Sequence, residues 1–142
     1  MENQIIIGDA LKTLQTLEGE SIQCCVTSPP YFGLRNYGVE GQIGLEKSPE
    51  DYIAKMVEVF REVKRVLKDD GTLWLNIGDS YNGNKKWNTE TQKNKSRVTD
   101  TFEKKLWQGA KVKDLIGIPW MLAFALRADG WYLRQDIIWN KP

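Results

Sequence analysis

The sequence of 142 residues contains no histidine and only two cysteines, Cys24 and Cys25, which are adjacent. The lack of histidine excludes Ser-His-Asp and Cys-His catalysis, the HExxH zinc helix and histidine proton relays. Adjacent cysteines form neither a disulfide framework nor a CxxC metal site, and they are typical of a reducing compartment. Any catalysis by this chain must therefore use other side chains.

The sequence also lacks long hydrophobic runs and an excess of charge. Its longest mostly apolar stretch, Leu115–Leu126, is too short to span a bilayer and is interrupted by Gly117 and Pro119. The segment Met1–Gly8 has neither the basic region nor the apolar core of a signal peptide. We therefore expect a soluble, cytoplasmic protein with no membrane partner. The 20 basic and 19 acidic residues exclude a simple polybasic tail.

Strand and helix patterns alternate along the chain. Short apolar runs predict strands at 5–7, 22–27, 72–77 and 131–139. Apolar residues at spacings of three and four predict helices near 11–17, 49–67 (closed by the turn 69–71) and 115–128. This alternation is typical of an open α/β sheet, in which ligands bind at the carboxyl ends of the strands. Asp9, Ser28 and Asp79 follow three predicted strands, so we expect chemistry there.

The most informative segment is Thr27–Phe32, which reads Thr-Ser-Pro-Pro-Tyr-Phe directly after a predicted strand. Two prolines fix φ and remove two backbone N–H donors, so the Ser28 hydroxyl and the Pro29 carbonyl can project as acceptors from a rigid turn. Tyr31 adds a flat aromatic face. Such a turn suits a planar group that carries an NH₂. The alternative is that the prolines only end the strand and that Tyr31 packs in the core.

Ser-Pro-Pro-Tyr after an apolar strand resembles the signature of the DNA methyltransferases that modify exocyclic amines, cytosine N4 or adenine N6. Segments 6–11, 73–81 and 130–142 resemble neighbouring parts of the same family, in the order of its β-type members. The resemblance spans essentially the whole chain. It implies an α/β, Rossmann-like class I methyltransferase sheet, S-adenosyl-L-methionine as cofactor and double-stranded DNA as partner.

The resemblance also implies catalytic roles. Ser28 and the Pro29 carbonyl would accept the hydrogens of the target amine, and Pro30 would hold the turn. Positioning and electrostatics would supply most of the acceleration, without a metal. The target base must leave the duplex, and Tyr31 is the candidate ring on which it stacks. Serine in place of aspartate before the prolines favours cytosine N4 over adenine N6.

For the cofactor, the resemblance places the Asp9 carboxylate beside the adenosine, with Ala10 and Ser28 as further contacts. Asp9 is also suited to cap the helix that follows, and capping is compatible with the adenosine contact. Cys24 and Cys25 lie within an apolar strand, so we predict that both are core residues and not nucleophiles. Asp79 is either a turn residue or part of the site wall.

A basic stretch, Lys85–Lys113, contains nine basic and three acidic residues with aromatic residues between them. We predict a flexible basic loop at about 82–113, either solvated or in contact with DNA phosphates. The candidate DNA-binding residues are Lys85, Lys86, Arg97 and, at the end of the last predicted strand, Trp139.

One family feature is missing, the glycine-rich Phe-x-Gly-x-Gly turn that binds the methionine end of the cofactor. In β-type members this turn lies downstream of the segments found here. Residues 1–142 therefore resemble the catalytic portion of an incomplete sheet, inactive alone. We expect a missing C-terminal half or a second copy to cover its strand edges. The alternative is a catalytically inactive fragment, a DNA-binding or interaction remnant.

Overall fold

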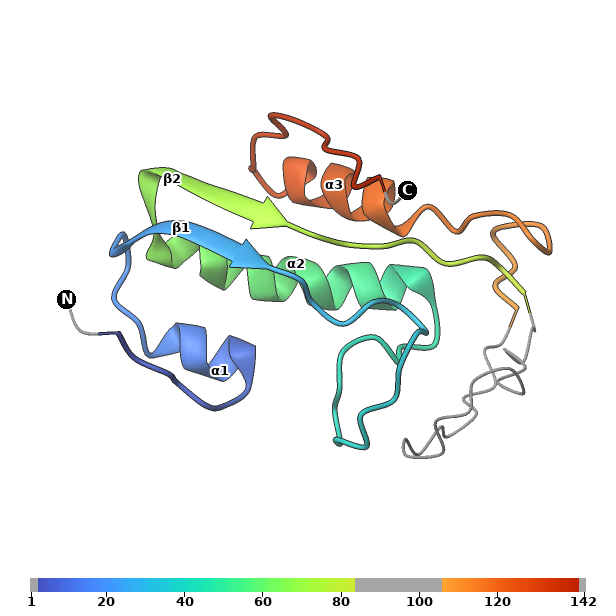
Figure 1. The fold of residues 1–142 in the computed structure, drawn as a ribbon, viewed down its shortest axis with the longest axis horizontal. Helices are drawn as coiled ribbons and strands as arrows, with labels where there is room; N and C mark the ends of the chain where they lie inside the picture. The colour runs from blue at the N-terminus through green and yellow to red at the C-terminus, as the bar shows by residue number, and fades with distance from the viewer. Residues whose placement is uncertain (1–2, 84–105, 141–142) are drawn as a thin grey trace.

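The computed structural model describes residues 3–83 and 106–140 (Figure 1). Its elements, in chain order, are α1 (Ala10–Gln15), β1 (Ile22–Thr27), α2 (Pro49–Val66), β2 (Leu67–Leu75) and α3 (Ile118–Ala128). The predicted α/β class is confirmed, and so are the three helices and the two central strands, with shifted ends for every element except β1.

Helix α2 is the centre of the fold, and its start is encoded locally. The Ser48 hydroxyl accepts a 3.1 Å hydrogen bond from the Asp51 N–H, Pro49 occupies the first turn, and acidic residues lie near the positive helix end. Apolar residues three and four apart then form one buried face, which consists of Tyr52, Ile53, Met56, Phe60, Val63 and Val66.

Strands β1 and β2 are parallel and hydrogen-bonded, and α2 connects them. The pairing runs from Ile22 opposite Leu67 to Thr27 opposite Leu75, with an irregularity between Ile22 and Cys24. This irregularity accommodates the extra residues 68–71 of β2, which are strand and not a turn. The prediction that a turn at 69–71 closes the preceding helix is wrong, because α2 ends at Val66 and Leu67 already pairs with β1.

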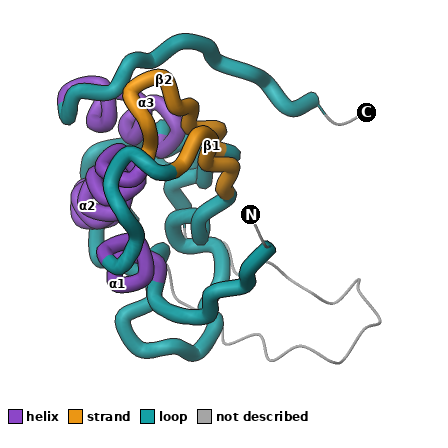
Figure 2. The backbone as a smooth tube through the Cα atoms, turned by 90° about the vertical axis from the view of Figure 1, so that its left-hand side faces the viewer, coloured by secondary structure: helices purple, strands orange, loops and turns teal. Residues whose placement is uncertain are grey.

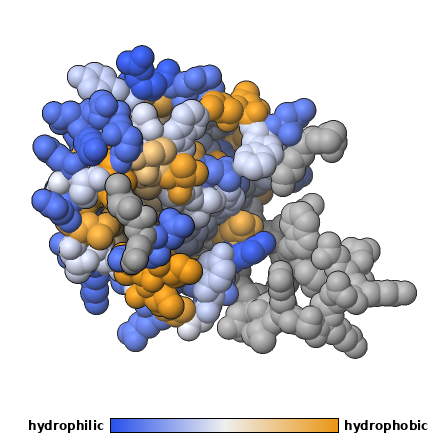
Figure 3. Space-filling model, turned by 60° about the vertical axis from the view of Figure 1, so that its left-hand side comes forward, coloured by the Kyte–Doolittle hydropathy of each residue, from blue (hydrophilic) through white to orange (hydrophobic). Residues whose placement is uncertain are grey.

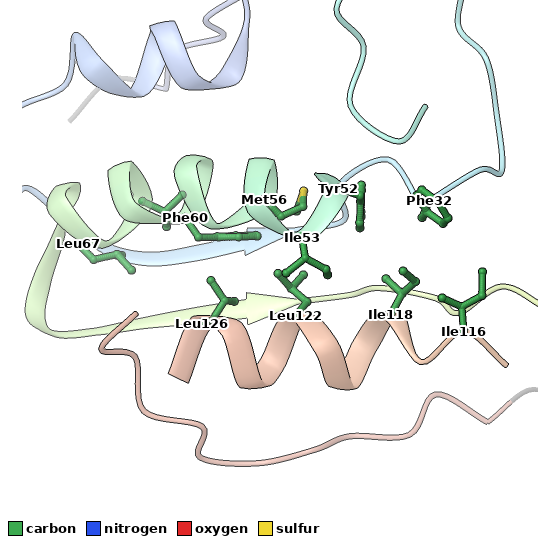
Figure 4. Close-up of a cluster of buried hydrophobic side chains, with 11 residues drawn as sticks. Phe32, Tyr52, Ile53, Met56, Phe60, Leu67, Ile116, Ile118, Leu122 and Leu126 are labelled. Carbon is green, nitrogen blue, oxygen red and sulfur yellow. The ribbon is translucent and has the colours of Figure 1, made fainter. Parts of the chain in front are cut away.

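The core lies between α2, α3 and one face of the sheet (Figure 4). The figure shows side chains of α2 and α3 pointing toward one another, and Phe32 and Ile116 extend the cluster beyond the helices. Cys25 is half-buried against this cluster, and burial, followed by the neighbouring Cys24, raises the pKa of its thiol. Cys24 is exposed, so the prediction that both cysteines are core residues is wrong for Cys24. Side chains alternate along a strand, and Cys24 faces away from the helices.

The predictions of strands at 5–7 and 131–139 are wrong, because neither segment is a strand in the described structure. Ile5 and Ile7 are 93% and 95% exposed. Both segments lie outside the two-stranded sheet, residues 3–8 on the side of β1 and 131–140 on the side of β2 (Figures 1 and 2). The physical reason is pairing: an extended segment needs a neighbouring strand for its backbone hydrogen bonds, and no described segment supplies one here.

Apolar side chains remain on the surface in several patches (Figure 3). On the sheet face opposite the helices, they include Val26 and Trp74. Within the described part of the chain, no helix is both long and apolar enough to cross a membrane.

Candidate functional site

The diproline corner lies at the carboxyl end of β1, beside the segment that follows β2. The Asn76 N–H donates a 2.9 Å hydrogen bond to the Thr27 carbonyl, and the Ser80 hydroxyl donates a 3.0 Å hydrogen bond to the Phe32 carbonyl. These two bonds bracket Ser28–Tyr31. The corner is therefore built from the ends of two adjacent parallel strands, where α/β sheets place their ligands.

Tyr52 of α2 supports the corner from the core side. Its hydroxyl donates a 2.9 Å hydrogen bond to the Pro30 carbonyl, and its ring packs against Phe32 with the centroids 5.6 Å apart. Tyr52 is fully buried. Burial, and then the nearby Glu46 and Tyr31, raise the pKa of the Tyr52 phenol well above its usual value, so the hydroxyl remains a donor even in alkaline solution.

Gly44 closes the loop that follows the corner. The Gly33 N–H donates to the Gly44 carbonyl at 2.7 Å, and the Gly44 N–H donates to Glu46 Oε2 at 2.8 Å. Gly44 has φ +103°, and a hypothetical Cβ there would lie only 3.0 Å from the Tyr31 carbonyl oxygen. No other residue therefore fits at this position without strain. The loop and the corner are thus one connected unit.

The ring of Tyr31 lies against the backbone of Gly78, which follows β2. A Cβ at Gly78 would be 2.8 Å from Tyr31 Cε2. Gly78 therefore leaves the space that the ring occupies. Tyr31 remains half-exposed, so the alternative of a core tyrosine does not describe it.

The four residues of the predicted catalytic motif line one pocket of about 310 Å³, together with Leu34, Arg35 and Tyr37 of the following loop. Ligand sites typically range from about 300 to about 1,000 Å³. Among the described residues, no donor pairs with the Ser28 hydroxyl or the Pro29 carbonyl. The structure thus brings the predicted residues together and leaves two acceptors open.

A larger hollow, of about 530 Å³, lies between α2 and α3. It contains none of the predicted site residues, and its walls are mostly apolar.

Two of the three predicted cofactor residues, Asp9 and Ala10, lie apart from this pocket, whereas the third, Ser28, lines it. Asp9 caps α1, because its Oδ1 accepts a 3.0 Å hydrogen bond from the Lys12 N–H, and Ala10 is the first residue of the helix. Both are exposed and neither lines the pocket. Arg65 of α2 anchors the other end of α1 with a 2.8 Å hydrogen bond to the Leu14 carbonyl. The capping role predicted for Asp9 is confirmed.

Asp79 caps a distant helix. Its carboxylate accepts hydrogen bonds of 3.0 and 3.1 Å from the N–H groups of Gly117 and Ile118, at the start of α3. Gly117 has φ +87° and no side chain to cap the helix itself. The one sequence signal for the contact between Asp79 and α3 was that this helix begins after a glycine, which has no side chain to cap it.

The basic segment has two anchored ends. Asn82 is 1% exposed, and its amide bonds the backbone of Trp107 and Ala110 at 2.6–3.0 Å. The candidate DNA-binding residues Lys85, Lys86 and Arg97 lie outside the described residues. Trp139 is 75% exposed and does not line the pocket.

Sequence reasoning missed three pocket residues, Leu34, Arg35 and Tyr37. The glycine-rich loop 31–44 is longer than most connections, which is itself a sign of function. No sequence pattern showed which of its side chains turn back toward the corner.

A Ser-Pro-Pro-Tyr corner with open acceptors, at the ends of parallel strands, is the arrangement expected of an amino-methyltransferase. The chain belongs to the N6/N4 DNA methylase family, whose model matches residues 22–142. The resemblance seen in the motifs is thereby confirmed.

Individual relatives are similar over nearly the whole chain. The type II methyltransferase M.SmaI of Serratia marcescens is 58% identical over 140 residues, which are 98% of this chain and 48% of that protein. M.XycI of Xanthomonas campestris pv. cyanopsidis is 57% identical, over 95% of this chain and 45% of the relative. M.SfiI of Streptomyces fimbriatus is 39% identical, over 97% of this chain and 30% of the relative. The chain therefore spans about half the length of M.SmaI, and less of M.SfiI.

Proposed function

We propose that this chain is the catalytic portion of a site-specific DNA methyltransferase that methylates the exocyclic amine of an extruded base. One observation carries the proposal: the Ser28 hydroxyl and the Pro29 carbonyl, both without a described partner, line a pocket with the Tyr31 ring. Membership of the DNA methylase family and the similarity to type II methyltransferases support it.

The chemistry follows from these residue types. The lone pair of an exocyclic amine is delocalised into the base, which makes the nitrogen a poor nucleophile. Two acceptors that hold the two amine hydrogens favour a pyramidal nitrogen with a localised lone pair. Because the corner is fixed by two prolines and by Tyr52, the acceptors need no reorganisation at the moment of reaction.

Tyr31 is proposed to stack on the extruded base. Base stacking on an aromatic ring is worth about 1–3 kcal/mol, which is comparable to the cost of extruding the base. The Gly78 backbone supports the other side of the ring.

The residues proposed to hold S-adenosyl-L-methionine are Asp9, Ala10 and Ser28. When bound, this cofactor supplies an electrophilic methyl group. The exposed Asp9 carboxylate fits a hydroxyl-rich adenosine, because only its Oδ1 is engaged, by the Lys12 N–H, among the described residues. Ser28, at the end of β1, would lie between cofactor and base.

We further propose that residues 1–142 form part of a larger Rossmann-like sheet, completed by a C-terminal half or a second copy. The exposed segments 5–7 and 131–139 would then pair with strands that the described structure does not contain. The basic region at about 82–113, with Lys85, Lys86 and Arg97, and the exposed Trp139 would contact double-stranded DNA. Cytosine N4 is the favoured target, because serine precedes the prolines.

A chimera tests this proposal. In it, residues 1–142 replace the matching segment of M.SmaI, and methyl transfer from labelled S-adenosylmethionine to DNA is measured. We expect transfer, with N4-methylcytosine as the product in nucleoside mass spectrometry. Ser28→Ala should lower the rate by about 100-fold, since one preorganised hydrogen bond to the reacting group is lost, and DNA affinity should change much less.

The matched control is Ser21→Ala, since the Ser21 hydroxyl only donates to the Glu18 carbonyl at 2.7 Å before β1. An unchanged rate in Ser28→Ala would remove Ser28 from the site. A folded, DNA-binding chimera without methyl transfer would instead point to an inactive remnant.

A further inference from the structure

The mouth of the pocket carries a cation that the proposed methyl transfer does not use. Arg35 lines the same pocket as Ser28 and Tyr31 and is exposed to solvent. The ion pairs of the described residues engage Lys55, Arg61 and Arg65 and leave Arg35 without a carboxylate partner. A guanidinium without an internal partner, at the opening of a pocket, is free to bind an external anion.

The backbone that carries Arg35 is held in place by two side chains of its own loop, Gln42 and Asn36. Gln42 Nε2 donates a 2.7 Å hydrogen bond to the Arg35 carbonyl, and Gln42 Oε1 accepts a 2.6 Å hydrogen bond from the Tyr37 N–H. Asn36 Oδ1 adds a 2.8 Å hydrogen bond from the Gly38 N–H. Few side chains of this loop are buried, so these bonds are what fixes the turn beside the pocket.

We infer that Arg35 binds the phosphodiester group beside the extruded nucleotide and that Gln42 is its positioning residue. The inference rests on the proposed function. A nucleotide that rotates out of a duplex carries its backbone phosphate to the mouth of the pocket that receives the base. The planar guanidinium fork matches two phosphate oxygens, which lysine does not do.

A neighbouring pocket residue, Tyr37, supports the assignment of Arg35 to the phosphate. Tyr37 is 58% exposed and lines the pocket next to Arg35. Its ring offers an apolar surface for the sugar that joins base and phosphate. Base, sugar and phosphate would thus meet Tyr31, Tyr37 and Arg35 in turn.

Salt dependence of DNA binding tests the inference without cofactor or catalysis. Binding of the 142-residue chain to a short single-stranded oligonucleotide is followed by fluorescence anisotropy at several salt concentrations. Arg35→Gln should reduce the slope of log K against log salt by about 0.7, the value for one lost phosphate contact on a single strand. Arg35→Lys should keep the slope and lower the affinity, because charge remains and the fork is lost.

Arg127→Gln is the matched control, since its guanidinium lies over the Phe124 ring of α3, 4.9 Å from the centroid, and lines neither pocket. It should leave the slope unchanged. Gln42→Ala should reproduce the reduced slope of Arg35→Gln, and the double variant should lose no more than either single variant.

An unchanged slope in Arg35→Gln, an equal change in Arg127→Gln, or no binding by the wild-type chain would overturn the inference. The inference would also be overturned if Arg35→Gln lowered the affinity by an amount that depends on the base sequence while the salt slope stayed constant. That result would indicate that Arg35 contacts a base. The two proposals can fail separately. If the chimera does not methylate DNA but Arg35→Gln still reduces the salt slope, the methyl transfer is refuted and the phosphate site is retained.

Discussion

The Tyr52 hydroxyl of α2 donates a 2.9 Å hydrogen bond to the carbonyl of Pro30. This bond joins the most buried face of the core to the corner that carries the proposed acceptors. It engages the carbonyl next to that of Pro29 and leaves the Pro29 carbonyl open toward the pocket. The rigidity of the site thus depends on the core helix as well as on the two prolines.

Tyr52→Phe should lower the free energy of unfolding by about 1–3 kcal/mol, because the Pro30 carbonyl loses its donor while the ring still fills its space. Urea denaturation followed by circular dichroism measures the difference. Tyr132→Phe is the control, since Tyr132 is 88% exposed and should give no change. Equal stability of Tyr52→Phe and wild type would mean that the bond contributes nothing.

Gly78→Ala should displace the Tyr31 ring, because the new Cβ would lie 2.8 Å from Cε2. NMR spectra of ¹³C-labelled tyrosine, with Tyr31 assigned through Tyr31→Phe, should show a shifted ring signal. Gly83→Ala provides the comparison, since a Cβ there meets nothing within 4 Å. A Tyr31 signal unmoved in Gly78→Ala would show that the ring does not rest on Gly78.

Asn82→Ala should destabilise the protein by about 1–3 kcal/mol, because it leaves partly buried backbone groups of Trp107 and Ala110 unpaired. Asn82→Asp keeps the acceptor for the Trp107 N–H and loses the two donated bonds, so we expect a loss here too. Urea midpoints give both values. If Asn82→Ala unfolds at the wild-type midpoint, the amide does not anchor this region.

The pair Arg61–Asp129 makes stability depend on pH. The hydrogen bond from Arg61 lowers the pKa of the Asp129 carboxyl below its ordinary value. The pair therefore stabilises the protein above the ordinary aspartate pKa of about 3.9, and this contribution disappears as the pH falls through the lowered pKa.

Arg61→Gln should accordingly be less stable than wild type near neutral pH, with a difference that shrinks on acidification. Urea midpoints between about pH 6 and about pH 2 test this. The effect is small, because both side chains contact solvent. Arg127→Gln should show no such trend, and a difference for Arg61→Gln that stays constant with pH would refute the assignment.

Elements with local signals were predictable from the sequence. Helix α2 carries its own cap at Ser48, a proline in the first turn and an apolar face at helical spacing, and β1 ends where Pro29 and Pro30 remove backbone donors. The motif Ser28–Tyr31 could be assigned to a strand end for the same reason.

Features that depend on distant partners were not predictable. Segments 5–7 and 131–139 have strand-like sequences, but pairing decides whether they become strands, and no described neighbour pairs with them. The contact of Asp79 with Gly117 spans 38 positions, and that of Tyr52 with Pro30 spans 22. Contacts between residues so far apart produce no periodic pattern in the sequence. The hydrogen bonds that hold the site in place could therefore be identified only from the structure.

The corner, its loop, the supporting helix and both flanking strand ends all come from one uninterrupted stretch, from β1 to Ser80. A gene rearrangement that moved other parts of the coding sequence from one end to the other would leave this stretch intact. The unit could thus be joined to different cofactor-binding or recognition segments in either order, so long as the breakpoints fell outside it.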